Sequence, residues 1–462
     1  MMSHFHNILL LFKICFFAEK HHILFDKHHI LPRYLRFLRF FFLIFCYPTN
    51  FFTKPKQDFV HRLHSFITSL GPIYIKFGQT LSTRPDLIGE HIAEALRSLQ
   101  DSLPAFSSEV ARSMIEMGLG SKIDLLFSKF YDEPVASASI AQVHKAILIN
   151  GENVAIKVLR PNILLLYERD LSFLEYLACI ITKLVSKSKR LKLVEVIKLF
   201  RHIMKSELDL RIEAASASKL DENFKDDTSI YIPKIYWEFT KSNILVMEWV
   251  DGISIYDRSL MLKHKIDPSE IALKIAVIFL NQAYRDGFFH ADLHPGNIIV
   301  SYEGRIILVD FGIIGVLDDK DRIAVAEILY AFLRRDYLLV AKIHHKLGYI
   351  PYNTSLVLFA QSCRAIAEPV VSKQICNISV GMLLTQLFQI TEEFGMETQP
   401  KLLMLQKTML VVEGIGKILD PKMNIWQTAE PWINKWAIKN LTPEAKLLRF
   451  AKKIFDNLLQ RY

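Results

Sequence analysis

The sequence is poor in cysteine and has no paired cysteine spacing. Its 462 residues include five cysteines, and no two of them form a C-x-x-C motif. Disulfide frameworks and zinc sites both need cysteines in characteristic paired spacings. The sequence therefore argues against both and predicts buried thiols in a reducing compartment.

Long apolar runs are also missing. The run FFFLIFCY at 40–47 has eight residues, whereas a helix that spans a bilayer needs about 20. The earlier run NILLLFKICFFA at 7–18 is interrupted by Lys13 and has no small-residue cleavage site. We therefore expect neither a transmembrane helix nor a signal peptide.

Basic charge is concentrated near the N-terminus. The formal net charge is +9, and residues 1–62 hold nine Lys and Arg against three Asp and Glu. Basic residues beside short, aromatic-rich apolar stretches are typical of segments that lie on an anionic membrane, which we predict for residues 1–60. The alternative is a helix packed on the protein with a solvated basic face. No basic stripe interleaves with aromatics in the central part, so we expect no nucleic-acid partner.

The composition, 51% apolar and 23% charged residues, is that of a folded protein with room for two or three domains. Helical periodicity dominates 61–124, short strand patterns dominate 125–250, and helical periodicity returns over 251–462. The pairs Asn-Gly at 150–151 and Glu-Gly at 303–304 each separate two alternating runs and predict β-hairpins. The predicted fold class is α+β, with a helical N-terminal extension, a small β-rich lobe and a helical lobe.

The stretch GFFHADLHPGNIIVSYEGRIILVDFG at 287–312 gathers polar side chains around the second hairpin. Asn297 stands where its first strand begins and Asp310 where its second strand ends. Asp292 lies five residues before Asn297, in a loop that a Pro-Gly pair forces to turn. Two carboxylates and an amide oxygen suit Mg²⁺, usually together with substrate phosphates. A transition-metal site in the His-x-Asp-x-His string is the alternative.

The same order of residues resembles the catalytic apparatus of protein kinases. By that resemblance Asp292 is the catalytic aspartate, and Asn297 and Asp310 bind the metal. Upstream, VAIKVLRP presents Lys157 on a strand, where a kinase lysine holds the α- and β-phosphates. The resemblance implies a bilobal protein-kinase-like fold that binds ATP and Mg²⁺.

Two further kinase parts lie between these motifs. Lys157 needs a glutamate from a following helix, and the sequence offers Glu207 and Glu213. Because they are six residues apart on the expected helix, they point in different directions and cannot both reach one lysine. The hinge that would bind adenine through its backbone is LVMEWVDG, with Glu248 and Val250 at its centre.

Two features differ from protein kinases. The stretch PVASASIAQVHKA at 134–146 replaces the glycine-rich phosphate loop and contains no glycine, so each Cβ limits close backbone approach. Its predicted nucleotide-binding residues are Val135, Ala136, Ser137, Ala138, Ser139, Ile140, Ala141, Gln142 and Val143. After Asp-Phe-Gly a helix cap at Asp318 or Asp319 follows almost at once. The activation loop and the A-P-E motif that support peptide docking are therefore missing.

With GPIYIKFGQTLSTRPDLI at 71–88, these features resemble the UbiB-type atypical kinases of ubiquinone biosynthesis. The matching motifs are KFGQ at 76–79 (the family's K-x-G-Q), ASAS at 136–139 (its alanine-rich loop), ELD at 207–209 (its E-x-D), HADLHPGN and DFG. The resemblance implies that Lys76 pairs with Glu207, which leaves Glu213 to Lys157. Gln79 and Asp209 complete the two regulatory motifs.

The resemblance also implies a function: ATP and Mg²⁺ binding, ATPase-type activity, and support of the ring-modification steps of ubiquinone synthesis. The expected partners are a lipid or quinone precursor, an anionic membrane surface and other ubiquinone-biosynthesis proteins. Many bacterial members end in a membrane-spanning hairpin, but this chain has no apolar run of that length. We therefore expect a protein of the bacterial cytoplasm that is peripheral on the inner membrane.

Two other functions remain open from the sequence. A small-molecule phosphotransferase of the aminoglycoside or choline kinase type shares H-x-D-x-H-P-G-N but lacks the K-x-G-Q helix. The third possibility is a non-catalytic, nucleotide-gated scaffold of a biosynthetic complex. The full set Lys157, Asp292, Asn297 and Asp310 argues against it, because pseudokinases usually lose at least one of these residues.

Overall fold

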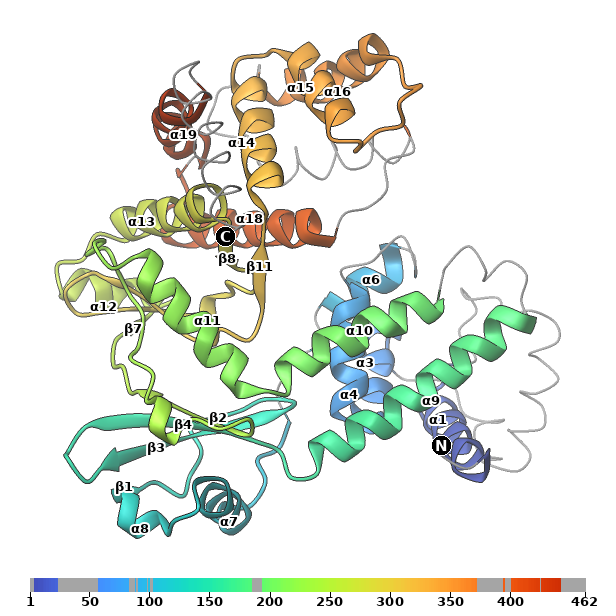
Figure 1. Ribbon diagram of the computed structural model, residues 1–462, viewed down its shortest axis with the longest axis vertical. Coiled ribbons are helices and arrows are strands. Elements are labelled where there is room, and N and C mark those ends of the chain that lie inside the picture. Colours follow the sequence, from blue (N-terminus) through green and yellow to red (C-terminus); the bar gives the residue numbers. More distant parts are fainter. Residues whose placement is uncertain are drawn as a thin grey trace, which may run out of the picture. The chain divides into compact units, whose positions relative to one another are not determined.

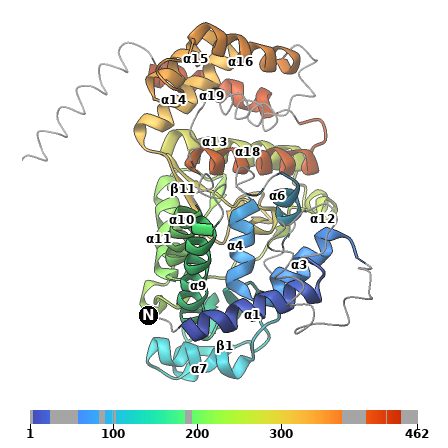
Figure 2. The same ribbon diagram turned by 90° about the vertical axis from the view of Figure 1, so that its right-hand side faces the viewer.

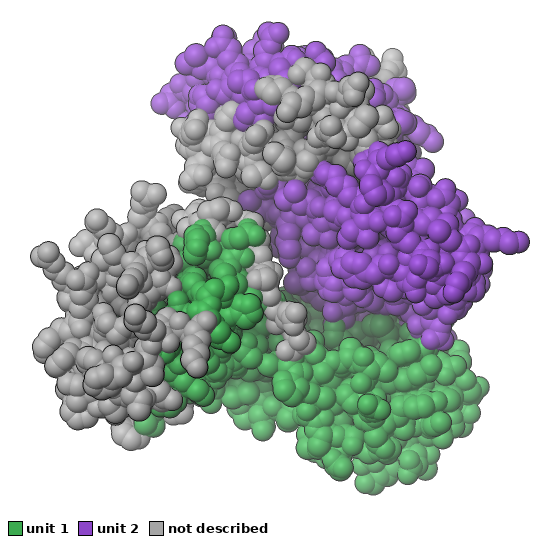
Figure 3. All heavy atoms as spheres, turned by 180° about the vertical axis from the view of Figure 1, so that it is seen from behind, with its two compact units in different colours: residues 1–212, 235–249 green, residues 213–234, 250–462 purple. Residues whose placement is uncertain are grey.

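The computed structural model describes residues 4–23, 57–82, 88, 90–97, 99, 103–184, 193–371, 394, 400–423 and 425–441. The chain divides into two compact units, which have different colours in Figure 3. The first consists of Met1–Ile212 and Ile235–Trp249, and the second of Glu213–Lys234 and Val250–Tyr462. The apolar run at 40–47 lies outside the described residues.

An antiparallel sheet of order β1-β3-β4-β6 lies in the first unit, and the short β2 pairs with β3. Its strands are β1 (Phe127–Phe130), β2 (Ala136–Ser137), β3 (Ala141–Leu148), β4 (Asn153–Leu159) and β6 (Ile244–Glu248). The β3–β4 hairpin predicted from the Asn-Gly pair is confirmed. Its turn residue Gly151 has φ +88°, a left-handed conformation that glycine adopts without steric cost.

The other described elements of the first unit are helical. They are α1 (His4–Lys20), α3 (Phe59–Leu70), α4 (Pro72–Ser82), α6 (Glu90–Arg97), α7 (Ser108–Leu119), α8 (Ile123–Leu126), α9 (Ile163–Leu184), α10 (Leu193–Glu207) and the single turn η3 (Trp237–Phe239). Helix α7 packs on the sheet, where Val154, Ile156 and Val158 of β4 are fully buried in one core cluster. Side chains alternate along a strand, so Lys157 lies on the opposite face of the sheet.

Helices α3, α4 and α6 share a second core cluster of the first unit. The chain breaks between α3 and α4 at Gly71, and Pro72 begins α4, a position where proline costs no hydrogen bond. Within α4, a Cβ at Gly78 would lie 2.8 Å from Leu99 Cδ1. The glycine of the K-x-G-Q motif therefore permits close packing on Leu99.

The second unit combines two small sheets with helices. Its strands are β5 (Ile230–Tyr231), β7 (Ile253–Ser254), β8 (Phe288–His290), β9 (Ile298–Val300), β10 (Ile306–Leu308) and β11 (Ile314–Val316). One sheet has the order β5-β10-β9-β7, and β8 pairs with β11 in the other. The β9–β10 pairing confirms the hairpin predicted from the Glu-Gly pair. Helix α11 (Leu210–Asn223) begins in the first unit and continues into the second.

The other described elements of this unit are helical. They are α12 (Arg258–Lys263), α13 (Pro268–Leu280), η4 (Asn281–Asp286), η5 (Pro295–Asn297), α14 (Asp319–Leu333), α15 (Tyr337–Lys346), α16 (Leu356–Val371), α18 (Pro400–Leu419) and α19 (Ile425–Leu441). Helix α13 is mostly buried and apolar, and α18 runs beside it in Figures 1 and 2. None of the described helices is long and apolar enough to cross a membrane.

Candidate active site

The two histidines of the HADLHPGN loop support the backbone. The buried His290 ring contacts the Val309 carbonyl at 3.3 Å through Nε2 and accepts the Asp292 N–H at 3.2 Å through Nδ1. Burial lowers the pKa of His290, so a neutral ring with its proton on Nε2 satisfies both contacts. His294 Nδ1 accepts the Gly296 N–H at 3.1 Å and caps the turn η5.

These contacts bear on whether the two histidines could bind a transition metal. Among the residues that the structure describes, no group of three His, Cys, Asp or Glu could hold a metal ion. Both ring nitrogens of His290 and one ring nitrogen of His294 already contact main-chain groups. The His-x-Asp-x-His alternative therefore has no support in this part of the chain.

Asn297 and Asp310 are placed by the β9–β10 hairpin, whose ends they occupy. The Asn297 amide nitrogen donates to the Asp292 carbonyl at 3.0 Å, and the Asn297 carbonyl accepts the Val309 N–H at 3.0 Å. With its nitrogen committed, the Asn297 amide presents Oδ1 as the end suited to a cation. Asp310 follows Val309 and is exposed. An amide oxygen and an exposed carboxylate fit a magnesium ion.

The D-F-G turn brings a further carboxylate close to Asp310. Asp310 has φ +60°, an uncommon conformation that Asp tolerates better than most residues. A Cβ added at Gly312 would lie 3.4 Å from Asp310 Oδ1 and 3.9 Å from Glu213 Oε2. The absence of a side chain at 312 thus leaves room beside both carboxylates, and Glu213 itself is buried.

The chain after the D-F-G turn is as short as the sequence predicts. Strand β11 begins at Ile314 and pairs with β8. Asp318 then caps α14 by accepting the Asp321 N–H at 2.8 Å. The described structure therefore passes from Gly312 through one short strand to a helix, with no activation loop between them.

The alanine-rich loop of the first unit is closed by its own contacts. Ala138 donates its N–H to the Ala141 carbonyl at 2.8 Å, and Val135 donates to Val143 at 2.8 Å. The Arg160 guanidinium donates to the Ala138 carbonyl at 2.8 and 3.0 Å. Both amides therefore have acceptors within the loop in this structure, and their predicted contact with nucleotide stays a prediction.

Gln142 has a different position from the rest of the predicted nucleotide loop. Its side chain is fully buried, accepts the Phe106 N–H at 3.1 Å and contacts His144 Nε2 at 2.8 Å. The side chain joins β3 to the segment before α7. Any contact of Gln142 with nucleotide has to come from its main chain.

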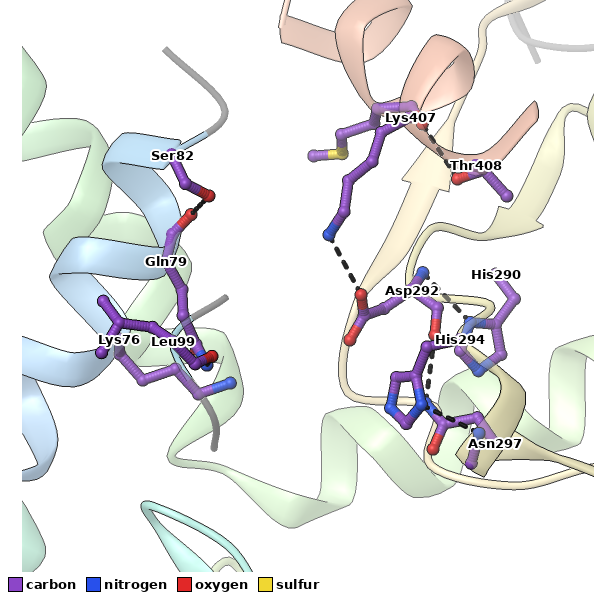
Figure 4. Close-up of polar contacts among 12 residues, drawn as sticks. Lys76, Gln79, Ser82, Leu99, His290, Asp292, His294, Asn297, Lys407 and Thr408 are labelled. Carbon is purple, nitrogen blue, oxygen red and sulfur yellow. Dashed lines mark hydrogen bonds and ion pairs between the residues drawn. The ribbon is translucent and has the colours of Figure 1, made fainter. Parts of the chain in front are cut away.

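The K-x-G-Q and E-x-D motifs meet within the first unit. Lys76 Nζ on α4 lies 3.3 Å from Glu207 Oε2 at the end of α10, and the two side chains are only 13% and 7% exposed. The Gln79 amide donates to the Leu99 carbonyl at 3.4 Å (Figure 4). Asp209 accepts two bonds from the Arg211 guanidinium and one from the Arg211 N–H, and these hydrogen bonds lower the pKa of Asp209.

Glu207 and Glu213 do not share one helix, contrary to the prediction from the sequence. Glu207 ends α10, whereas Glu213 lies on α11, which begins at Leu210. They are on separate helices because the chain breaks at Asp209, after which Leu210 donates its N–H to the Ser242 carbonyl. The two carboxylates are assigned to different units. The pairing of Glu213 with Lys157 joins residues of different units and stays a prediction.

Lys157 and the hinge belong to the same sheet. On β4, Lys157 pairs with Leu245 of β6, and Val154 pairs with Glu248. The sheet continues one residue further, where Trp249 donates its N–H to the Asn153 carbonyl at 3.0 Å. Val250 is the first residue of this segment that belongs to the second unit.

One residue that contacts Asp292 was not found from the sequence. Lys407 Nζ, on α18, lies 3.1 Å from Asp292 Oδ1. The two residues are 115 positions apart, and an exposed lysine on a long helix gives no local sign of such a contact.

Comparison with known proteins assigns the family. The ABC1 atypical kinase-like domain matches residues 98–344, and the UbiB helical domain matches residues 363–424. A "Probable protein kinase UbiB" of Marinobacter nauticus is 43% identical over 410 residues, covering 88% of this chain and 75% of that protein. The chain belongs to the UbiB family. A protein of the same name from Azotobacter vinelandii is 40% identical over 429 residues, covering 92% and 79%.

A solved structure supports the fold of this UbiB-family chain. The structure of Rv3197 with erythromycin from Mycobacterium tuberculosis aligns with a TM-score of 0.52 and 24% identity, covering 76% of this chain and 90% of that one. Together with the ABC1 domain, this likeness confirms the predicted α+β, protein-kinase-like fold. The family assignment also decides against the aminoglycoside or choline kinase type.

Proposed function

We propose that this UbiB-family chain is an ATP-dependent phosphotransferase or ATPase that supports ubiquinone biosynthesis at a membrane surface, on or near a prenylated quinone precursor. The observation that supports it most strongly is the joint placement of Asp292, Asn297 and Asp310 around one hairpin. The relatives' name, "Probable protein kinase UbiB", supports the same chemistry.

Each residue has a defined role in this proposal. Asn297 and Asp310 hold Mg²⁺, which neutralises phosphate charge when it is bound. Lys157 binds the phosphates, and Glu213 orients Lys157. The main chain around 248–250 binds adenine.

Asp292 is the proton acceptor. The bond between the γ-phosphorus and the oxygen it shares with the β-phosphate breaks, and its electron pair leaves with ADP. A new bond forms from phosphorus to the acceptor oxygen, whose proton passes to Asp292. A substrate hydroxyl as acceptor gives kinase activity, and water gives ATPase activity.

Replacement of Asp310 tests the metal site. Asp310→Asn removes one carboxylate charge but keeps a residue type that tolerates the left-handed conformation. We expect Mg²⁺-dependent ATP binding, measured by calorimetry, to weaken at least about tenfold, because Mg²⁺ prefers carboxylate oxygens. Asp336→Asn is the matched control, since Asp336 caps α15 and Asn caps helices equally well. Unchanged ATP affinity in Asp310→Asn contradicts the assignment.

Complementation separates chemistry from a scaffold role. A strain that lacks this protein is supplied with Asp292→Asn, and its quinones are profiled. We expect no restoration, although the variant remains folded and binds ATP, because the proton acceptor is gone. Full restoration by this variant supports the scaffold instead.

Helix α1 supports the membrane part of the proposal. Leu9, Phe12 and Phe16 are 51%, 43% and 37% exposed, and a spacing of three and four places them on one face. Lys13 and Lys20 lie on the same helix. Exposed apolar side chains beside lysines fit the interface of an anionic bilayer.

Substitution on this face tests the membrane proposal. Replacing Leu9, Phe12 and Phe16 together by serine leaves the buried Leu10 and Ala18 of α1 in place. We expect co-sedimentation with vesicles of phosphatidylglycerol and phosphatidylcholine to fall at least about fivefold, because apolar burial drives such binding. Equal sedimentation of the variant and the wild type excludes this face as the contact.

A further inference from the structure

The catalytic aspartate has a partner from the UbiB helical domain. Lys407 extends from α18 to Asp292, as Figure 4 shows, with 3.1 Å between Nζ and Oδ1. Helix α18 packs against α13 and β11, and β11 pairs with β8, which leads into the catalytic loop. Elements of one compact unit therefore hold the lysine and the aspartate together.

The contact contributes little to stability. The Lys407 and Asp292 side chains are 48% and 34% exposed, and exposed ion pairs contribute only about 0–1 kcal/mol. Helix α18 has a stronger anchor in Lys401, which pairs with the buried Asp321. Asp321 also accepts a 2.6 Å bond from the Tyr349 hydroxyl. Lys407 is thus not needed to hold α18, and its contact is easily exchanged for another.

Phosphoryl transfer needs positive charge at this place. The transition state spreads negative charge over the oxygens of the transferred group, and preorganised cations stabilise it. The catalytic loop at 291–297 contains no Lys or Arg. His294 lies in the loop, but its Nδ1 accepts a backbone N–H. A lysine from outside the loop is well suited to the task, since its charge lies on a flexible stem.

We propose that Lys407 is the cation on the acceptor side of this active site. It pairs with Asp292 when no nucleotide is bound and contacts oxygens of the phosphoryl group during its transfer from ATP. This role rests on the proposed function, because it requires Asp292 to be the proton acceptor. It also gives the UbiB helical domain a direct part in the chemistry.

A transition-state mimic tests the role without an acceptor. Lys407→Met and Lys407→Arg are compared with wild type for binding of Mg²⁺–ADP and of Mg²⁺–ADP with aluminium fluoride. We expect Lys407→Met to bind the fluoride complex at least about tenfold more weakly while ADP affinity stays the same, because the cation acts on the transferred group. Lys407→Arg should retain most of the affinity. Lys417→Met is the control, since Lys417 pairs with Glu413 on the same helix.

The outcomes separate this inference from the proposed function. Equal binding of the fluoride complex by Lys407→Met and wild type overturns the role of Lys407 alone, provided that Asp310→Asn weakens ATP binding. If Asp310→Asn binds ATP like wild type, the proposed function itself fails. Faster ATP hydrolysis by Lys407→Met identifies an inhibitory contact and also overturns the proposal. Equal melting temperatures of Lys407→Met, Asp310→Asn and wild type exclude a folding defect.

Discussion

Among single residues, the conformation of Asp310 explains why some substitutions there are informative and others are not. At φ +60° an alanine adds backbone strain to the loss of charge, whereas asparagine is tolerated. An Asp310→Ala variant that loses nucleotide thus mixes two effects. Asp310→Asn isolates the loss of the charge that we propose to bind the metal.

The alanine-rich loop allows another residue-level prediction. Ala138→Gly frees a turn that is closed by the Ala141 carbonyl and Arg160, because glycine permits positive φ and closer backbone approach. We expect the ratio of ATP to ADP affinity to change at least about threefold, since only the γ-phosphate distinguishes the two ligands. The measurement is calorimetric titration with each nucleotide in Mg²⁺.

Arg160→Lys should shift this ratio in the same direction, because lysine cannot reproduce the two bonds to one carbonyl. The matched control is Arg112→Lys, in an exposed pair with Asp132 of the same unit. If both loop variants keep the wild-type ratio, the loop does not control the phosphates.

Sequence patterns predict that candidate site residues lie together when these residues are close in the chain, but not when they are far apart in it. Asn297 and Asp310 could be placed together because one short hairpin joins them. Lys407 could not be found, since α18 reaches Asp292 only through packing on α13 and β11. The break at Asp209 was also missed, because helical periodicity continues on both sides of it and the bond to the Ser242 carbonyl is a tertiary contact.

Among the secondary-structure elements, the ribbon of β8 and β11 has little tolerance for added volume. Gly315 pairs directly with Phe289, and a Cβ at Gly315 would overlap the Phe289 ring. Phe289 is fully buried, so it cannot move aside cheaply. Close packing of this ribbon supports the loop that carries Asp292.

We predict that Gly315→Ala destabilises the protein by about 1–3 kcal/mol, the usual cost of overpacking a core. Denaturant unfolding followed by circular dichroism measures the change. Gly414→Ala in α18 is the control, because a Cβ there meets nothing within 4 Å and alanine favours helix. A Gly315→Ala variant as stable as wild type means that Phe289 can repack.

For the whole molecule, burial of His344 makes stability depend on pH. His344 lies between Tyr349 and Phe359, and burial lowers its pKa from 6.5 to about 4. Below pH 6.5 the unfolded chain binds a proton that the folded protein does not. This contribution to stability is therefore lost as the pH falls from 6.5 to about 4, by roughly 3 kcal/mol in total.

His344→Met removes the titrating group and keeps an apolar side chain. We expect its free energy of unfolding to fall less between pH 7 and pH 5 than that of wild type, by about 1–2 kcal/mol. Urea unfolding at the two pH values provides the comparison. Parallel losses in both proteins assign the acid sensitivity to other groups.

The division of the chain into units could not be drawn along the sequence. Residues 213–234 belong to the second unit although residues 235–249 belong to the first. The physical reason is strand pairing, because β5 pairs with β10 in parallel while Ile235 pairs with Met247 of β6. Domain boundaries drawn along the sequence at 124 and 250 cannot describe units whose segments alternate along the chain. The order of helical and strand-rich stretches could be predicted, because it follows from the hydrophobic periodicity.

The short path from Gly312 to α14 has a consequence for inhibitor design. Phe311 is fully buried, and three residues later the chain pairs with β8. An inhibitor that displaces the Phe311 side chain to open a pocket behind it would also have to separate β11 from β8, because β11 follows Phe311 so closely. Selective compounds should therefore be sought among those that leave Phe311 in place.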